Sequence, residues 1–231
     1  MTDPVTEAPQ PAYTQRFLFL AVLFVACLIA ANIIAVKLVS VAGMVLPAAV
    51  IIFPLSYILG DVITEVYGYR DARRVIWLGF AANLLVVAAL WAGQMLPAAG
   101  FWDGQAAYER ILGAVPRIVA ASLIAYLIGE FANAYVLARM KVATQGRFLW
   151  ARTIGSTIIG QGLDSVVFMT VAFAGVFPAR ALAGAVVAQW LVKVAYEALA
   201  TPLTYAAVNH LKRREGRDAY DRDIGFNPLS L

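Results

Sequence analysis

The chain has a single cysteine, Cys27, and a single histidine, His210. One cysteine cannot close an intrachain disulfide or form a thiolate metal site, so Cys27 is expected to be a small packing residue. A histidine-based catalytic triad is implausible, because His210 lies at the end of the last hydrophobic segment. The sequence also lacks the Gly-x-x-x-x-Gly-Lys-[Ser/Thr] phosphate loop and the His-Glu-x-x-His zinc motif. We therefore predict no metal and no cofactor, and no nucleotide hydrolysis by the phosphate-loop route.

Charged residues are also scarce. Only 14% of the residues are Asp, Glu, Lys or Arg, whereas 62% are hydrophobic and the mean hydropathy is +0.76. This balance lies well beyond that of a soluble globular domain. Apolar stretches of about 20 residues, the length that crosses roughly 30 Å of hydrocarbon, recur along the chain. They predict an all-α integral membrane protein in a lipid bilayer, a bundle of six transmembrane helices near residues 17–39, 44–66, 74–97, 117–138, 154–177 and 181–209.

The positions of the basic residues predict the orientation in the membrane. Of the 18 Lys and Arg residues, 13 are Arg16 or fall within 70–74, 139–152 and 212–222. The positive-inside rule places these residues on the cytoplasmic side, which predicts six crossings with both termini in the cytoplasm. The net charge of +4 therefore reflects membrane topology. We predict no nucleic-acid partner, because the bases are not gathered on one soluble face.

The chain divides into three parts on this basis. Residues 16–211 are expected to form one compact six-helix transmembrane domain, since little sequence remains for a soluble domain. Residues 1–15 contain three prolines among polar residues and are expected to be a disordered cytoplasmic tail. Residues 212–231 are expected to be a basic cytoplasmic tail.

One local motif occurs twice. The segment 57–62 reads Tyr-Ile-Leu-Gly-Asp-Val, and the segment 126–131 reads Tyr-Leu-Ile-Gly-Glu-Phe at an offset of 69 residues. Pro47 and Pro116 keep the same offset. Both copies would run from the outside to the inside, which predicts a parallel internal repeat. Chance similarity between two apolar helices is the alternative.

Several of the predicted spans carry carboxylates at membrane depth. A carboxylate in lipid costs several kcal/mol, so it is normally kept for a substrate, ion or proton pathway. Asp61 and Glu130 each lie nine residues before an arginine, about 13 Å along a helix and hence near the midplane. The polar residues of each span are spaced by three or four and so share one helix face. The candidate substrate-binding residues are Asp61, Glu65, Glu130, Asn133, Gln161, Asp164, Lys193 and Glu197. They predict that the domain 16–211 is a transporter with its binding site inside the bundle.

The chemistry of these residues bears on the ligand. Five of them are acids, and the spans contain only Lys37 and Lys193 as cations. A cationic ligand, or one rich in N–H donors, therefore fits better than an anion, unless the acids are protonated. The aromatic side chains that could stack on a flat ring are Tyr57, Tyr126, Phe168, Trp190 and Tyr196. The competing interpretation is structural: polar side chains join helices through hydrogen bonds, Glu65 reaches the cytoplasmic interface, and the aromatics pack the bundle.

The segment 60–69, Gly-Asp-Val-Ile-Thr-Glu-Val-Tyr-Gly-Tyr, is followed by a basic turn. It resembles the signature of the queuosine precursor transporter family, also called the vitamin uptake transporter family. The resemblance extends to Val115-Pro116-Arg117-Ile118, Gly129-Glu130 with Asn133, and Gly160-Gln161 with Asp164-Ser165. It implies a transporter of the bacterial plasma (inner) membrane rather than an enzyme. The implied substrates are 7-cyano-7-deazaguanine and 7-aminomethyl-7-deazaguanine, imported for queuosine salvage in tRNA modification.

The residues are consistent with such a substrate. A guanine edge offers adjacent N–H donors that one carboxylate can accept together, and its ring can stack on an aromatic side chain. Asp61 or Glu130 would read the base, and Asn133 and Gln161 would complete the edge. The residues do not decide which acid has which role.

Two other functions stay open. The substrate-binding subunit of an energy-coupling-factor vitamin transporter is also a six-helix protein, and it docks on an energising ATPase module through Ala-x-x-x-Ala. Ala26–Ala30 and Ala31–Ala35 match that pattern. The second alternative is a membrane-embedded enzyme that uses Asp61 and Glu130. We favour a solitary carrier, for which proton coupling through one of the acids is one option. The preferred deazaguanine, the energy coupling and a homo-oligomeric state are left open.

Overall fold

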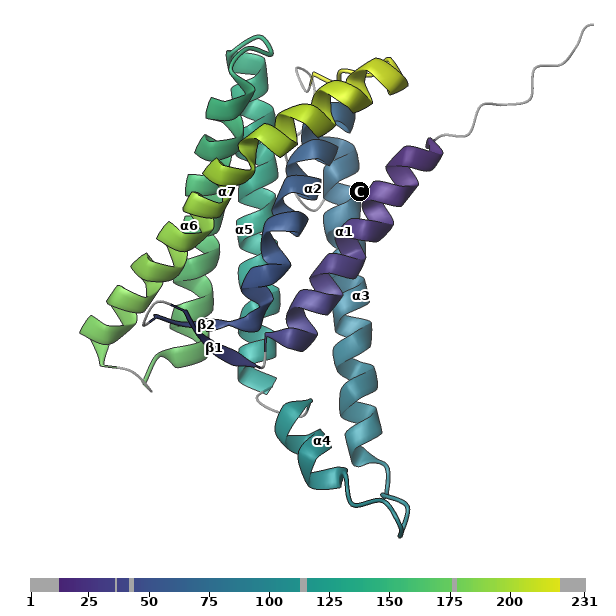
Figure 1. Cartoon of the computed structure of the whole chain (residues 1–231), viewed down its shortest axis with the longest axis vertical. Helices are drawn as coiled ribbons and strands as arrows, with labels where there is room; N and C mark the ends of the chain where they lie inside the picture. The colour runs from purple at the N-terminus through teal and green to yellow at the C-terminus, as the bar shows by residue number, and fades with distance from the viewer. Residues whose placement is uncertain (1–12, 36, 42–43, 113–115, 176–177, 221–231) are drawn as a thin grey trace, which may run out of the picture.

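The computed structural model describes residues 13–35, 37–41, 44–112, 116–175 and 178–220 (Figure 1). Most of the predicted tail 1–15, and the predicted tail beyond residue 220, lie outside these ranges. The α-helices are α1 (Gln15–Ile34), α2 (Phe53–Tyr67), α3 (Tyr69–Met95), α4 (Gln105–Ile111), α5 (Pro116–Ala143), α6 (Leu149–Phe173) and α7 (Ala179–Glu215). The remaining elements are the strands β1 (Leu38–Val41) and β2 (Met44–Pro47) and the 3₁₀ turn η1 (Ala48–Ile51).

The long helices alternate in direction along the chain (Figure 1). α1, α3 and α6 run away from the end at which the first helix begins, and α2, α5 and α7 return to it. The start of α1 and the end of α7 meet there, where Arg16 and Glu215 form an ion pair of 3.1 Å. Short α4 lies at the opposite end. Five helices of the described part are long and apolar enough to cross a membrane. The chain is thus a multi-pass α-helical membrane protein.

The expected helix over residues 44–66 is wrong for its first part. β1 pairs antiparallel with β2, and η1 follows before α2 begins at Phe53. α2 therefore has 15 residues, about 22 Å, which is less than the roughly 30 Å of a hydrocarbon core. The valines of this hairpin favour extended backbone, and Pro54 suits the first turn of α2, where no N–H is needed. Six helices of full spanning length are accordingly not confirmed.

Other helix ends also differ from the expected spans. α1 ends at Ile34 instead of residue 39, because the chain turns into the hairpin. α7 continues to Glu215, so the predicted tail 212–231 is helical at its start. Pro202 lies inside α7 without ending it.

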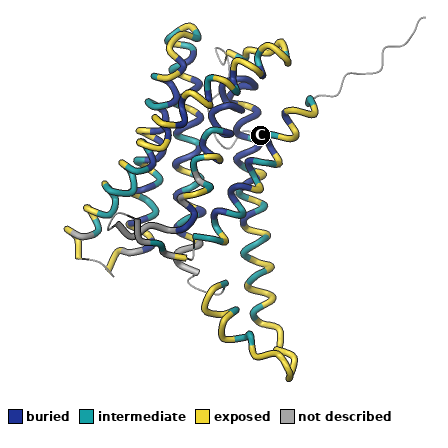
Figure 2. The backbone as a smooth tube through the Cα atoms, viewed as in Figure 1, coloured by how far each residue is buried: buried dark blue, intermediate teal, exposed yellow. Residues whose placement is uncertain are grey.

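The surface of the bundle is apolar. Figure 2 shows buried residues on the inward sides of the helices and exposed residues on their outward sides. Large apolar side chains such as Phe19, Leu85, Leu199 and Leu203 are at least 66% exposed. In a membrane protein this outer surface is the one that faces lipid, and the polar groups are left to the interior.

Two glycines bring α5 and α6 into close contact. A Cβ on Gly160 would lie 2.8 Å from the carbonyl oxygen of Gly129, and a Cβ on Gly129 would lie 2.9 Å from that of Gly160. Small residues at such crossings let membrane helices approach closely. The crossing also sets Asn133 of α5 beside Gly160, and Asp164 of α6 beside Gly129.

Candidate functional site

Buried polar side chains from four helices gather in the interior of the bundle. We call them the central polar cluster: Asp61 of α2, Glu130 and Asn133 of α5, Gln161 and Asp164 of α6, and Lys193 and Glu197 of α7. All are buried except Asp164, which is partly buried. The structure thus brings together seven of the eight predicted substrate-binding residues, and Glu65 is the exception.

Asp61 and Asn133 form the direct link between α2 and α5. Asn133 Nδ2 donates a hydrogen bond to Asp61 Oδ1 over 2.7 Å. Asp61 is fully buried, so this amide is an important partner for its charge or for its acid group. The bond orients the carboxyl group and leaves Asp61 Oδ2 without a hydrogen-bond partner in the described part of the chain.

Gly60 determines how near Glu130 comes to α2. A Cβ at position 60 would lie 2.5 Å from Glu130 Oε1 and 3.3 Å from the ring of Phe24. The lack of a side chain at Gly60 therefore leaves room for the Glu130 carboxyl group in its present position beside α1 and α2. A glycine precedes the acid in both copies of the motif, at positions 60–61 and 129–130. Packing explains the glycine, because in both copies it lies at a close contact between helices.

The cluster contains several acceptor atoms without a partner. Asp61 Oδ2, Asn133 Oδ1, Gln161 Oε1 and both carboxyl oxygens of Glu197 are buried and receive no hydrogen bond from the described residues. A buried acceptor left unpaired costs about 1–3 kcal/mol, more when it is charged. A ligand that supplies N–H donors, or protons on the acids, would remove this cost. The arrangement suits a donor-rich ligand.

Lys193 is the cation of the cluster. It forms an ion pair with Asp164 across α6 and α7, and its Nζ lies 6.0 Å from the ring centroid of Tyr57. The i,i+4 spacing would also allow a pair with Glu197, but both Glu197 oxygens lack a hydrogen-bond partner in the described part. Asp164 is therefore charge-compensated, whereas Asp61 and Glu197 have no ion-pair partner among the described residues.

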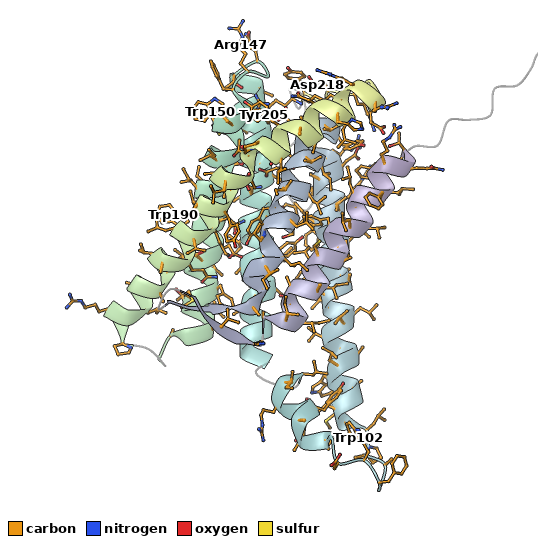
Figure 3. All side chains as sticks on the ribbon, viewed as in Figure 1. Trp102, Arg147, Trp150, Trp190, Tyr205 and Asp218 are labelled. Carbon is orange, nitrogen blue, oxygen red and sulfur yellow. The ribbon has the colours of Figure 1, made fainter. Side chains whose placement is uncertain are left out.

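The five candidate aromatic residues lie in different surroundings. Tyr57 is buried and lies beside Lys193 of the cluster. The hydroxyl of Tyr126 is buried near Gly79 of α3, and Phe168 is partly buried on α6. Trp190 donates its Nε1–H to the Ile158 carbonyl over 3.0 Å and lies on the outer side of α7 (Figure 3). Tyr196 is 39% exposed. Tyr57 thus contacts the cluster through Lys193.

Glu65 belongs to a second charged group nearer the end of the bundle that carries the termini. Its Oε1 accepts hydrogen bonds from Arg152 at 2.6 Å and Lys212 at 2.8 Å, and Lys141 Nζ lies 3.5 Å away. We call Glu65, Lys141, Arg152, Lys212 and Asp218 the Glu65 cluster. It joins α2, α5, α6 and α7. The Glu65 carboxylate is therefore compensated by the protein itself.

The chain after α7 folds back onto this second cluster. Asp218 contacts Lys141 at 2.5 Å and Lys212 at 2.9 Å, and the Ala219 N–H donates to the Val66 carbonyl over 3.3 Å. Partial burial by itself raises the pKa of Asp218, but the hydrogen bonds and charges of the two lysines outweigh it and leave the pKa below its usual value. Segment 217–220 is thus fastened across the ends of α2, α5 and α7.

Sequence reasoning did not identify the partners of Glu65. The available signal was depth, because Lys141, Arg152 and Lys212 belong to basic segments that border the spans at the end of the bundle where Glu65 lies. Two amides outside the central cluster, Asn32 and Asn83, join helices through hydrogen bonds. Ser122 donates to Asn32, and Asn32 donates to Asn83, so this set joins α1, α3 and α5.

The comparisons with known proteins point to one family. Residues 47–207 match the family model described as "Putative vitamin uptake transporter". A probable queuosine precursor transporter of Bacillus subtilis is 32% identical over 148 residues, which are 64% of this chain and 65% of the relative. The queuosine precursor transporter of Escherichia coli is 29% identical over 121 residues, 52% of each chain. A probable one of Haemophilus influenzae is 26% identical over 121 residues, 52% of this chain and 49% of the relative.

The matched segments span between about half and just under two thirds of these relatives. No solved structure matches the chain. The matched family region contains all seven residues of the central polar cluster.

Proposed function

The chain belongs to the vitamin uptake transporter family, and we propose that it imports a queuosine precursor, 7-cyano-7-deazaguanine or 7-aminomethyl-7-deazaguanine. The observation that carries this proposal is the set of buried, unpartnered acceptors on Asp61, Asn133, Gln161 and Glu197. The deazaguanine edge is rich in N–H donors and uncharged, so it supplies hydrogen bonds without adding an anion. The names of the relatives point to the same substrate class.

We assign the guanine edge to Asp61. Its Oδ1 is oriented by Asn133 while Oδ2 is unpartnered, so the carboxylate can accept two neighbouring N–H groups in a bidentate fashion. Asn133 Oδ1 and Gln161 Oε1 are further acceptors for the remaining donors. Tyr57 is the stacking aromatic of choice because it borders the cluster through Lys193. We do not assign Glu65 to the substrate, because Arg152 and Lys212 compensate its charge through Oε1.

The membrane topology follows from the same bundle. We propose that α2 and the hairpin before it make the sixth crossing, because α2 runs antiparallel to α1 and α3 (Figure 1). The end that carries Arg16, Arg147 and Asp218 is the cytoplasmic one by the positive-inside rule. Trp102 lies at the opposite end of the molecule from Arg147 (Figure 3). The motif copies in α2 and α5 run in the same direction, which supports the parallel repeat.

A solitary carrier is favoured over a subunit that docks on an ATPase module. Docking through Ala-x-x-x-Ala needs alanines on an outer helix surface, and Ala31 is fully buried in the bundle. The pair Ala31–Ala35 is thereby disfavoured, and only Ala26–Ala30 keeps an exposed member. Co-purification with an ATPase would reverse this choice.

The test uses a bacterium that can neither make nor import these precursors. The chain is expressed in it, one precursor at a time is supplied at low concentration, and queuosine in tRNA is measured. Wild type and the control Asp103→Asn, an exposed acid outside the bundle, should restore queuosine, whereas Asp61→Asn should not. Correctly inserted wild type that fails with both precursors would contradict the substrate assignment.

A further inference from the structure

The carboxyl group of Glu130 is not among the acceptor atoms assigned to the substrate. It borders a narrow crevice between α1, α2 and α3, whose other lining residues are Phe24, Gly60, Ile63, Thr64, Ala72, Val75 and Ile76. The side chain is 4% exposed. Apart from Thr64 this lining is apolar, and the Thr64 hydroxyl already donates to the Gly60 carbonyl over 2.9 Å. The crevice thus offers Glu130 no cation and no spare donor.

We propose that Glu130 is the proton-carrying residue of this transporter, distinct from the substrate-reading Asp61. A carboxyl group among apolar side chains is stable as a neutral acid and costly as an anion. Asp61 differs because Asn133 donates to it and because the substrate would donate to it as well. The two acids of the repeated motif therefore have different tasks. This inference rests on the proposed import of a deazaguanine.

The position of the crevice bears on the direction of the proton. Its lining residues on α2 and α3 lie on both sides of Gly68, where the two helices connect at the end that carries the termini. This is the end that we propose to be cytoplasmic. The crevice is closed to water in this state, so a proton that Glu130 receives from the outer side would be released to the cytoplasm after the bundle opens at this end. Substrate and proton would move inward together.

Other charged groups around Glu130 set when it can release the proton. Asp61 and Tyr57 face it from α2, Asp164 from α6, Lys193 and Glu197 from α7, and Tyr126 lies one turn before it on α5. Lys193, the cation of this set, is paired with Asp164. Binding of an N–H-rich substrate to Asp61 would therefore change the field at Glu130 and couple the two events.

The first test measures transport in proteoliposomes with labelled 7-cyano-7-deazaguanine. Wild type should accumulate the label when the outside is more acidic than the inside, and a protonophore should abolish this accumulation. Glu130→Gln should still exchange labelled for unlabelled substrate but should lose the stimulation by the pH gradient. Glu130→Asp keeps a titratable group and should keep the stimulation with a displaced pH profile. The control Asp103→Asn should behave as wild type.

The second test needs no substrate. Infrared difference spectra of reconstituted protein, recorded while the pH is raised, should show loss of a protonated carboxyl band that is absent in Glu130→Gln and present in Asp103→Asn. If that band persists in Glu130→Gln, or if Glu130→Gln still responds to the pH gradient, Glu130 is not the proton carrier. If the band is assigned to Glu130 but wild type moves no deazaguanine, the substrate proposal fails and the proton site stands.

Discussion

Asn133 holds Asp61 through a 2.7 Å hydrogen bond that crosses from α5 to α2 at the centre of the bundle. The two residues lie 72 positions apart in the sequence. The bond leaves one oxygen of each side chain unpartnered, Asp61 Oδ2 and Asn133 Oδ1. The pair thus combines a structural contact between helices with two acceptors that are available to a ligand.

Asn133→Ala should lower uptake strongly, measured per amount of folded protein in the membrane. Hydrogen bonds to a charged group contribute about 1.5–3 kcal/mol, which corresponds to roughly a 10- to 100-fold loss of transport efficiency. Queuosine formation in tRNA, measured against substrate concentration, reports this loss. Asn209→Ala, on an exposed position of α7, is the matched control and should transport as wild type. Uptake by Asn133→Ala within twofold of wild type would exclude a role for the amide.

Gly160→Ala should destabilise the contact between α5 and α6. The new Cβ would lie 2.6 Å from the Asn133 Cβ and 2.8 Å from the Gly129 carbonyl oxygen, so backbone has to move. Such overpacking costs about 1–3 kcal/mol. Thermal unfolding in detergent should show a lower midpoint for Gly160→Ala. Gly184→Ala, which meets nothing within 4 Å, should not lower it.

Lys193→Gln should destabilise the protein more than the double variant Lys193→Gln/Asp164→Asn. Removal of one partner of a buried ion pair leaves an uncompensated charge and costs about 3–5 kcal/mol, whereas removal of both leaves none. The two residues are 10% and 18% exposed, so the lower part of that range is expected. Unfolding midpoints of the two single variants and the double variant measure the coupling. Additive effects would mean that the pair contributes nothing.

Asp218 should fasten segment 217–220 in a pH-dependent manner. Its pKa is lower in the folded state than in the unfolded state, because the lysine contacts outweigh the effect of burial. The stabilisation is therefore complete above the unfolded-state pKa of about 3.9 and is lost as the pH falls through the lower folded-state pKa. Hydrogen exchange at the Ala219 amide, corrected for the intrinsic rate at each pH, should show full protection near neutrality.

The variant Asp218→Asn should lose that protection at every pH, since the amide cannot compensate Lys141 and Lys212. Asp103→Asn again serves as the control with an exposed acid outside the bundle. Equal protection of Ala219 in wild type and Asp218→Asn would show that the backbone hydrogen bond to Val66 is sufficient to hold the segment.

The sequence by itself determined the class of protein and most of the central polar cluster. Long apolar runs have to be helical in lipid, because every backbone N–H and C=O must be paired within the segment. The cost of a carboxylate at membrane depth then predicted Asp61, Glu130 and Asp164 as candidate site residues. Helical spacing was enough to predict that they share inward faces with Asn133 and Gln161.

Only the tertiary structure decided how these groups are paired. Glu65 has the same chemistry as Glu130, but Arg152 and Lys212 reach it from other helices, while Gly60 admits Glu130 to an apolar crevice. The hairpin before α2 likewise depends on pairing between β1 and β2, which hydropathy does not encode. Charge compensation and close contact are properties of neighbours distant in sequence. Composition and residue spacing determine how deep a polar side chain lies in the membrane and which face of its helix it occupies. The packing of the helices determines which side chains it contacts.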